Sequence, residues 1–305
     1  ILALNVTRSL DETRAQDPPS DPPVAPTAEM ATEWDLVRRA QHYEEDAIKS
    51  LYETYYPKIY NYAFMQMGDV HSAEDLASDV MLKMIESIQS YKFRGLPFGA
   101  WVFRIARTRL IDLLVQQDRG DEALTQSLEL AGIYRDMAEI DMARKTLANS
   151  LRLSQQLATG NGWSLKILHM MGDMDLSRLD QRRALRVYEQ IRTLDPGDDK
   201  ARVNLIDLNL RIGQEDQAAK ELDSYLEFLV ESGRGPEALN LLEEMAREHP
   251  GKQSLHARLA EAYKAAGRTA DAISQYDALG EVQLDAGQNE DAIRSIQAII
   301  DLNPP

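Results

Sequence analysis

Apolar residues near the start of the chain recur every three or four positions, which is the spacing of one buried face on an α-helix. The pattern begins at Glu33 and ends where Gly68 and Asp69 interrupt it. Six positions fit a single periodic face, so we expect one helix across them. They are Leu36, Ala40, Tyr43, Ala47, Leu51 and Tyr55.

Two further helices are predicted before residue 119. Ser72, followed three residues later by Asp75, resembles a capping box, so we expect a helix to start there with Ser72 as its N-cap. Pro97 is well placed for the first turn of the next helix, which we expect to run to about Val115. The buried stripes are Leu76, Val80, Met84 and Ile88 in the first helix, and Phe98, Trp101 and Ile105 in the second.

Beyond Arg119 the chain repeats itself. Five alanines each lie five residues after a turn position, and their separations alternate between 34 and 20 residues, giving a period of 54. Prolines recur with the same period. Such self-similarity is typical of a solenoid of stacked helices. The alanines are Ala184, Ala218, Ala238, Ala272 and Ala292, the turn positions are Leu179, Gly213, Gly233, Gly267 and Gly287, and the prolines are Pro196, Pro250 and Pro304.

The chain is therefore expected to be all-α and to have three parts. Residues 1–30 are rich in proline and acidic residues, which predicts a disordered arm. Residues 31–119 form a helical domain, and residues 120–305 form a repeat domain. Within the repeats, residues 155–176 fit the period poorly, and the glycines at 160–162 indicate a loop.

Composition excludes several classes of function. The chain has 44% hydrophobic and 28% charged residues, as globular proteins do, and no cysteine, which excludes disulfides and thiolate chemistry. Its five histidines show no metal-site spacing, and no phosphate-binding loop or nucleophile motif is present. We expect no enzymatic activity, no cofactor and no metal. With no bilayer-spanning apolar run and no leader pattern, we expect no membrane association and a cytoplasmic location.

Charge is unevenly distributed along the chain, whose formal net charge is −16. Residues 91–119 carry six basic and two acidic side chains, a local charge of +4, whereas residues 120–305 carry 21 basic and 32 acidic ones, or −11. The acidic body should repel nucleic acid at long range, while the basic segment is suited to phosphates. The repeats could also fold over this basic patch and mask it.

The repeat residues resemble the tetratricopeptide family. The resemblance rests on the 34-residue spacing, covers roughly residues 121–305, and implies antiparallel helix pairs that bind an unknown protein or peptide. The matching residues include Ala260, Tyr263, Gly267, Ala272, Tyr276 and Pro304.

Residues 33–119 resemble region 2 of a bacterial sigma factor of the extracytoplasmic-function type. Four segments occur in that family's order: LVRRAQ, then LY..YY..IY, then AEDL, and finally PFGAW followed by RIAR. The resemblance implies a bundle of three to four helices with RNA polymerase core and promoter DNA as partners. The expected polymerase-binding residues are Asp75, Leu76, Asp79, Val80 and Lys83. The expected DNA-binding residues, for the minus-ten region, are Tyr91, Lys92, Phe93, Arg94, Phe98, Trp101, Arg104, Arg107 and Arg109.

Both sets of roles have plainer alternatives. Aromatic rings beside cations suit a melted strand, because bases stack on the rings while the cations hold phosphates. Phe98 and Trp101 at helical spacing equally fit a buried core, and Lys92 and Arg104 equally fit a solvated surface. Arg104 and Arg107 are three residues apart, so they share a helix face.

Departures from the family leave two hypotheses open. After Asp112 the chain reads LLVQQD where the family has arginines, and no helix-turn-helix for the upstream element is recognisable after residue 119. A lone region 2 should bind promoter DNA weakly on its own. The first hypothesis is a sigma-type initiation factor with a regulatory repeat domain. The second is a non-catalytic tetratricopeptide scaffold whose sigma-like domain no longer directs promoter opening.

Overall fold

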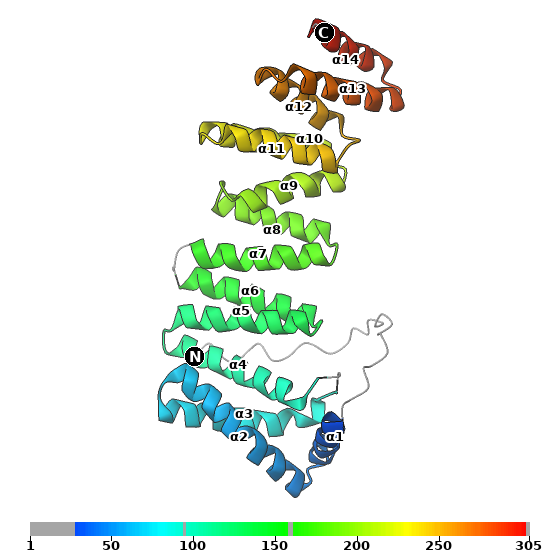
Figure 1. The fold of residues 1–305 in the computed structure, drawn as a ribbon. Helices are drawn as coiled ribbons and strands as arrows, with labels where there is room; N and C mark the ends of the chain where they lie inside the picture. The colour runs from blue at the N-terminus through cyan, green and yellow to red at the C-terminus, as the bar shows by residue number, and fades with distance from the viewer. Residues whose placement is uncertain (1–27, 94–95, 158–160, 303–305) are drawn as a thin grey trace. The chain divides into compact units, whose positions relative to one another are not determined.

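A computed structural model describes residues 28–93, 96–157 and 161–302, and this part of the chain is almost entirely helical. It contains fourteen α-helices, one short 3-10 turn and no strand (Figure 1). The expected all-α fold is confirmed. The predicted arm lies mostly outside the described residues, although the first helix already begins at Ala28.

The chain forms two compact units, and the boundary between them falls after Ala138. The sequence placed the boundary at residue 119 instead. The difference arises because helix α5, Gly120–Asp136, packs against helix α4, Phe98–Gln116, and so belongs to the first unit.

Within the described residues, the first unit contains five helices and the 3-10 turn. Helix α2 packs against α1, α3 and α4, and α3 also packs against α4. The largest fully buried side chains of this unit include Leu51, Ile59, Met81, Met84 and Phe98. Besides α4 and α5, this unit contains α1 (Ala28–Gln41), α2 (Glu45–Met67), α3 (Val70–Ser87) and the 3-10 turn (Ile88–Ser90).

The single helix expected from Glu33 onward is two helices, because the chain turns sharply at Tyr43. This residue has a left-handed backbone, with φ of 58°, and its side chain is 53% exposed, so it is not part of the buried stripe. The side chain of Arg39 bonds Glu44 across the turn at 2.7 Å. Periodicity missed the break because Tyr43 happens to fall in phase with both helices.

The N-cap of α3 is also different from the expected one. The helix begins at Val70, and the carboxylate of Asp69 accepts a hydrogen bond from the backbone N–H of Ser72 at 2.8 Å. This hydrogen bond is the main reason why the pKa of Asp69 lies below its usual value. Asp69, not Ser72, is therefore the cap.

The second unit is a succession of helices in which each one packs against its neighbours along the chain. This is the arrangement expected of a repeat solenoid. Its helices are α6, Ile140–Gln156, α7, Asn161–Ser177, α8, Gln181–Leu194, α9, Asp199–Arg211, α10, Glu215–Glu231, α11, Gly235–Glu248, α12, Gln253–Ala265, α13, Thr269–Asp285, and α14, Asn289–Asp301. Residue 160 of the predicted loop lies outside the described residues, and α7 already begins at Asn161.

All five predicted turn positions have a left-handed backbone, with φ between 59° at Leu179 and 77° at Gly213. The alanine five residues after each turn is buried, which explains why a small side chain recurs there. Asp118 and Ala138 make two more such turns, with φ of 57° each, five residues before buried alanines. The sequence did not predict these two turns, because the separation of 41 residues between Ala143 and Ala184 breaks the alternation of 34 and 20. Pro304 lies outside the described residues.

None of the helices in the described part of the chain combines the length and the apolar composition that a bilayer crossing requires.

Candidate functional site

The outer face of α3 carries the exposed part of the predicted polymerase-binding set. Asp75 and Asp79 are exposed and lie one helical turn apart. Lys83 is also exposed, and its ammonium group donates a hydrogen bond to Glu86 at 3.3 Å. Leu76 and Val80 are only 3% and 0% exposed, so these two belong to the core. They can stabilise α3 but cannot contact a partner directly.

Leu82 completes this face, and the sequence analysis missed it. Its side chain is 57% exposed, unusual for a leucine in the middle of a helix. It follows Asp79 by three residues and Asp75 by seven, so all three lie on one side of α3. The same helical spacing could have identified it. The α3 face is thus an apolar side chain flanked by carboxylates, a pattern suited to a protein partner.

The aromatic residues predicted to stack on bases pack mainly on one another. Ring centroids of Tyr91, Phe98 and Trp101 are 5.1–5.2 Å apart in all three pairs. Phe98 is 2% exposed and Trp101 is 9% exposed. Both therefore form core, and Tyr91 is the half-buried member through which this cluster reaches the surface. Burial also raises the pKa of the Tyr91 hydroxyl.

Two residues of α1 with no predicted role contact this part of the chain, one through an aromatic ring and one through a side-chain amide. The ring of Trp34 lies 6.0 Å from that of Tyr91 and 5.4 Å from that of Phe93, which is half-buried. The side chain of Gln41 donates to the backbone carbonyls of Ile88 and Tyr91, at 3.0 and 2.8 Å. These contacts hold residues 88–93, which follow α3, against α1.

The predicted cations lie in different environments. Lys92 is exposed, Arg109 is half-buried, and Arg94 lies outside the described residues. The guanidinium of Arg107 bonds Glu129 and Gln126, both on α5, and that of Arg104 lies over the ring of another α5 residue. Arg104 and Arg107 therefore share one side of α4, as their spacing predicted, and α5 packs against that side.

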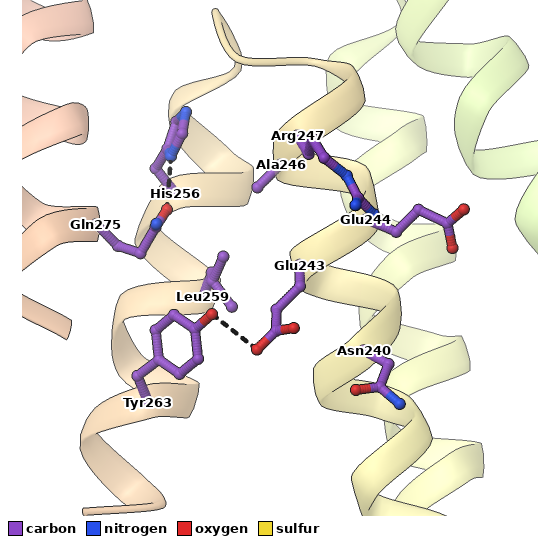
Figure 2. A pocket seen from close by; sticks show the side chains of 9 residues that line it. All are labelled: Asn240, Glu243, Glu244, Ala246, Arg247, His256, Leu259, Tyr263 and Gln275. Atoms are coloured by element: carbon purple, nitrogen blue, oxygen red, sulfur yellow. Dashed lines mark hydrogen bonds between the residues drawn. The ribbon is translucent and has the colours of Figure 1, made fainter. Parts of the chain in front are cut away.

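The repeat unit contains a groove between α11, α12 and α13 with a volume of about 520 Å³ (Figure 2). Leu259 and Tyr263 form part of its wall, and the Tyr263 hydroxyl donates to Glu243 at 2.8 Å. Burial and this carboxylate raise the pKa of Tyr263 to about 12. The ring of His256 contacts the side chain of Gln275 at 2.9 Å, so this histidine is held in place by α13.

One small group of potential metal ligands occurs within the described ranges. Oxygen and nitrogen atoms of Asp207, Glu248 and His249 lie within 4.8 Å of one another. Asp207 is already engaged, because it accepts from Arg211 at 2.8 Å and contacts His249 at 2.9 Å. A guanidinium beside the carboxylate is unfavourable for a cation, so these contacts fit an ion-pair network.

Comparison with known families supports both resemblances. The model of Sigma-70 region 2 matches residues 51–120, and that of the Tetratricopeptide repeat matches residues 180–228 and 229–285. The chain is 36% identical over 88 residues to the ECF RNA polymerase sigma factor BldN of Streptomyces coelicolor, 29% of this chain and 33% of the relative.

Two further relatives are of the same kind. Identity is 29% over 76 residues to the ECF RNA polymerase sigma factor SigW of Bacillus subtilis, 25% of this chain and 40% of the relative. It is 34% over 94 residues to the ECF RNA polymerase sigma factor RpoE of Cereibacter sphaeroides, 30% of this chain and 51% of the relative. The chain spans a third to a half of these relatives. Residues 51–120 thus match sigma-70 region 2, the chain is similar over part of its length to ECF sigma factors, and matches to the tetratricopeptide repeat follow within residues 180–285.

Proposed function

We propose that this protein is a non-catalytic, sigma-type transcription factor of the cytoplasm that docks on RNA polymerase core through the outer face of α3. The match to sigma-70 region 2, with Asp75 and Asp79 exposed on α3, is the observation that carries this proposal. The relatives are RNA polymerase sigma factors by name. Exposed carboxylates one turn apart would pair with cations on the polymerase, and Leu82, one turn further along α3, would bury its side chain beside them.

Promoter contact is the second part of the proposal. The segment from Tyr91 to Arg109 would hold the minus-ten region, with Tyr91 and Phe93 at the edge of the aromatic cluster and Lys92 on a phosphate. The buried rings of Trp101 and Phe98 would not contact DNA themselves but would fix the position of Tyr91. The tetratricopeptide repeats would bind a regulatory protein, because the groove between α11, α12 and α13 offers polar and charged side chains beside the apolar Leu259.

Binding of RNA polymerase core tests the docking step. The wild-type chain should retain bacterial core polymerase on a column, and the double variant Asp75→Arg/Asp79→Arg should lose it. Asp277→Arg/Glu281→Arg is the matched control, because these exposed acids on α13 have the same four-residue spacing and the same change of charge. Equal retention by both double variants would contradict docking through α3.

A second function is favoured by the contacts of Arg104 and Arg107 with α5. If those cations stay engaged, the domain would dock on polymerase without opening a promoter, and the protein would be a scaffold. Permanganate footprinting of a promoter library in the presence of core polymerase separates the two functions. Reactive thymines support initiation, whereas polymerase binding with no reactive thymine supports the scaffold.

A further inference from the structure

The edge where α5 meets α4 is built from contacts between an acidic helix and two arginines. Helix α5 carries four acidic residues and one basic residue, and α4 carries three basic residues and one acidic one. The Nη1 atom of Arg107 donates to Oε1 of Gln126 at 3.1 Å and to the carboxylate of Glu129. The guanidinium of Arg104 lies 5.6 Å from the ring centroid of Tyr134.

Helix α2 contributes an aromatic ring to the same edge. The ring of Tyr62 lies 5.8 Å from the guanidinium carbon of Arg107, and its hydroxyl donates to Gln126 at 3.2 Å. Gln126 is 7% exposed, and its amide also donates to Gln66 at 3.4 Å. Tyr62, Arg104 and Arg107 therefore form one surface with two cations and one ring, which we call the α2–α4 surface.

The groups that α5 places on this surface have the chemistry of a nucleic-acid strand. A carboxylate on a guanidinium occupies the position that a phosphate would take, since arginine binds both through the same charge-assisted N–H donors. An aromatic ring stacked on a guanidinium resembles a base stacked on it. The side-chain amide of Gln126 offers the same donors and acceptor as a base edge.

We propose that the α2–α4 surface binds single-stranded DNA, and that α5 occupies it as an internal competitor. The inference rests on the proposed promoter contact and adds a regulation to it. Competition starts at Glu129, because its side chain is 49% exposed, whereas that of Arg107 is 21% exposed. An arriving phosphate takes over the guanidinium, and the displaced carboxylate moves into water.

Binding of labelled single-stranded DNA to the full chain tests this competition. Glu129→Gln removes the carboxylate from Arg107, and Asp136→Asn is the matched control, because it removes one charge from the same helix, where its partner is Arg135. One extra phosphate contact should make the salt slope of log Kobs steeper by about 0.7, or about five-fold in affinity between 1 M and 0.1 M salt. Asp136→Asn should leave the slope unchanged.

A double variant separates competition from a general change of charge. Adding Arg107→Gln to Glu129→Gln should return affinity and salt slope to the wild-type values. Equal slopes for Glu129→Gln and Asp136→Asn, or a steep slope that persists in the double variant, would overturn the proposal. None of these variants changes the α3 face, so retention of core polymerase is a separate readout. If the wild-type chain does not retain core polymerase, this contradicts docking through α3 and leaves the competition at Arg107 unaffected.

Discussion

Glu33 on α1 caps the first turn of α4, because its Oε2 accepts a hydrogen bond of 3.0 Å from the backbone N–H of Phe98. Its other carboxylate oxygen accepts from the hydroxyl of Tyr55 on α2. Burial and this carboxylate raise the pKa of that hydroxyl. One side chain therefore joins three helices of the first unit around the aromatic cluster.

Replacing Glu33 by alanine should destabilise the first unit by about 1–3 kcal/mol, since it leaves the hydroxyl of Tyr55 and an N-terminal N–H of α4 without this partner. Urea unfolding followed by tryptophan fluorescence measures the effect, because Trp34 and Trp101 both lie in this cluster. Asp35→Ala is the control, since the ion pair of Asp35 with Arg38 is exposed. Equal midpoints for the two variants would contradict a structural role for the cap.

Trp101→Ala should lower the free energy of unfolding by about 3–5 kcal/mol, the usual range for a buried tryptophan. The reason is that Trp101 is 9% exposed and packs against Tyr91 and Phe98. Lys92→Ala, which removes an exposed side chain, should change stability by less than about 0.5 kcal/mol. If Trp101→Ala is as stable as the wild type, Trp101 is not a core residue, and the prediction that its ring stacks on a DNA base stands.

Leu179→Gly should stabilise the repeat unit by about 1 kcal/mol. Leu179 has a φ of 59° and an 81% exposed side chain, so it bears the strain of a left-handed residue without gaining a core contact. The reciprocal change Gly213→Leu, at a φ of 77°, should destabilise it by a similar amount. Thermal unfolding of both variants provides the measurement, and changes of the same sign would contradict the strain argument.

Alkaline pH should destabilise the repeat unit through Tyr263. The neutral phenol is favoured in the folded state, where its pKa is about 12, above the ordinary value near 10 of an unfolded chain. This contribution to stability is present below about pH 10 and is lost as the pH rises through about 12. Between about pH 10 and pH 12, the urea midpoint of Tyr263→Phe should fall less steeply than that of the wild type. If the two midpoints fall in parallel with pH, Tyr263 does not make this contribution to stability.

Local rules determined the helices and the repeats. A left-handed residue followed five positions later by a buried alanine needs only backbone sterics and a small side chain, so Gly213 and Ala218 could be recognised without a structure. The rule did not reach Asp118 and Ala138, because the separation of 41 residues between Ala143 and Ala184 interrupts the repeat period. Asp75 and Asp79 could likewise be placed on one face of a helix from their spacing alone.

Tertiary structure decided what covers each face. Spacing put Arg104 and Arg107 on one side of α4, but only packing brought α5, with Glu129, onto that side. Spacing could not tell whether Trp101 faces a base or a core, and contacts with rings from other segments place it in the core. Helical periodicity states which residues share a surface, whereas the partner of that surface depends on contacts between residues far apart in the sequence.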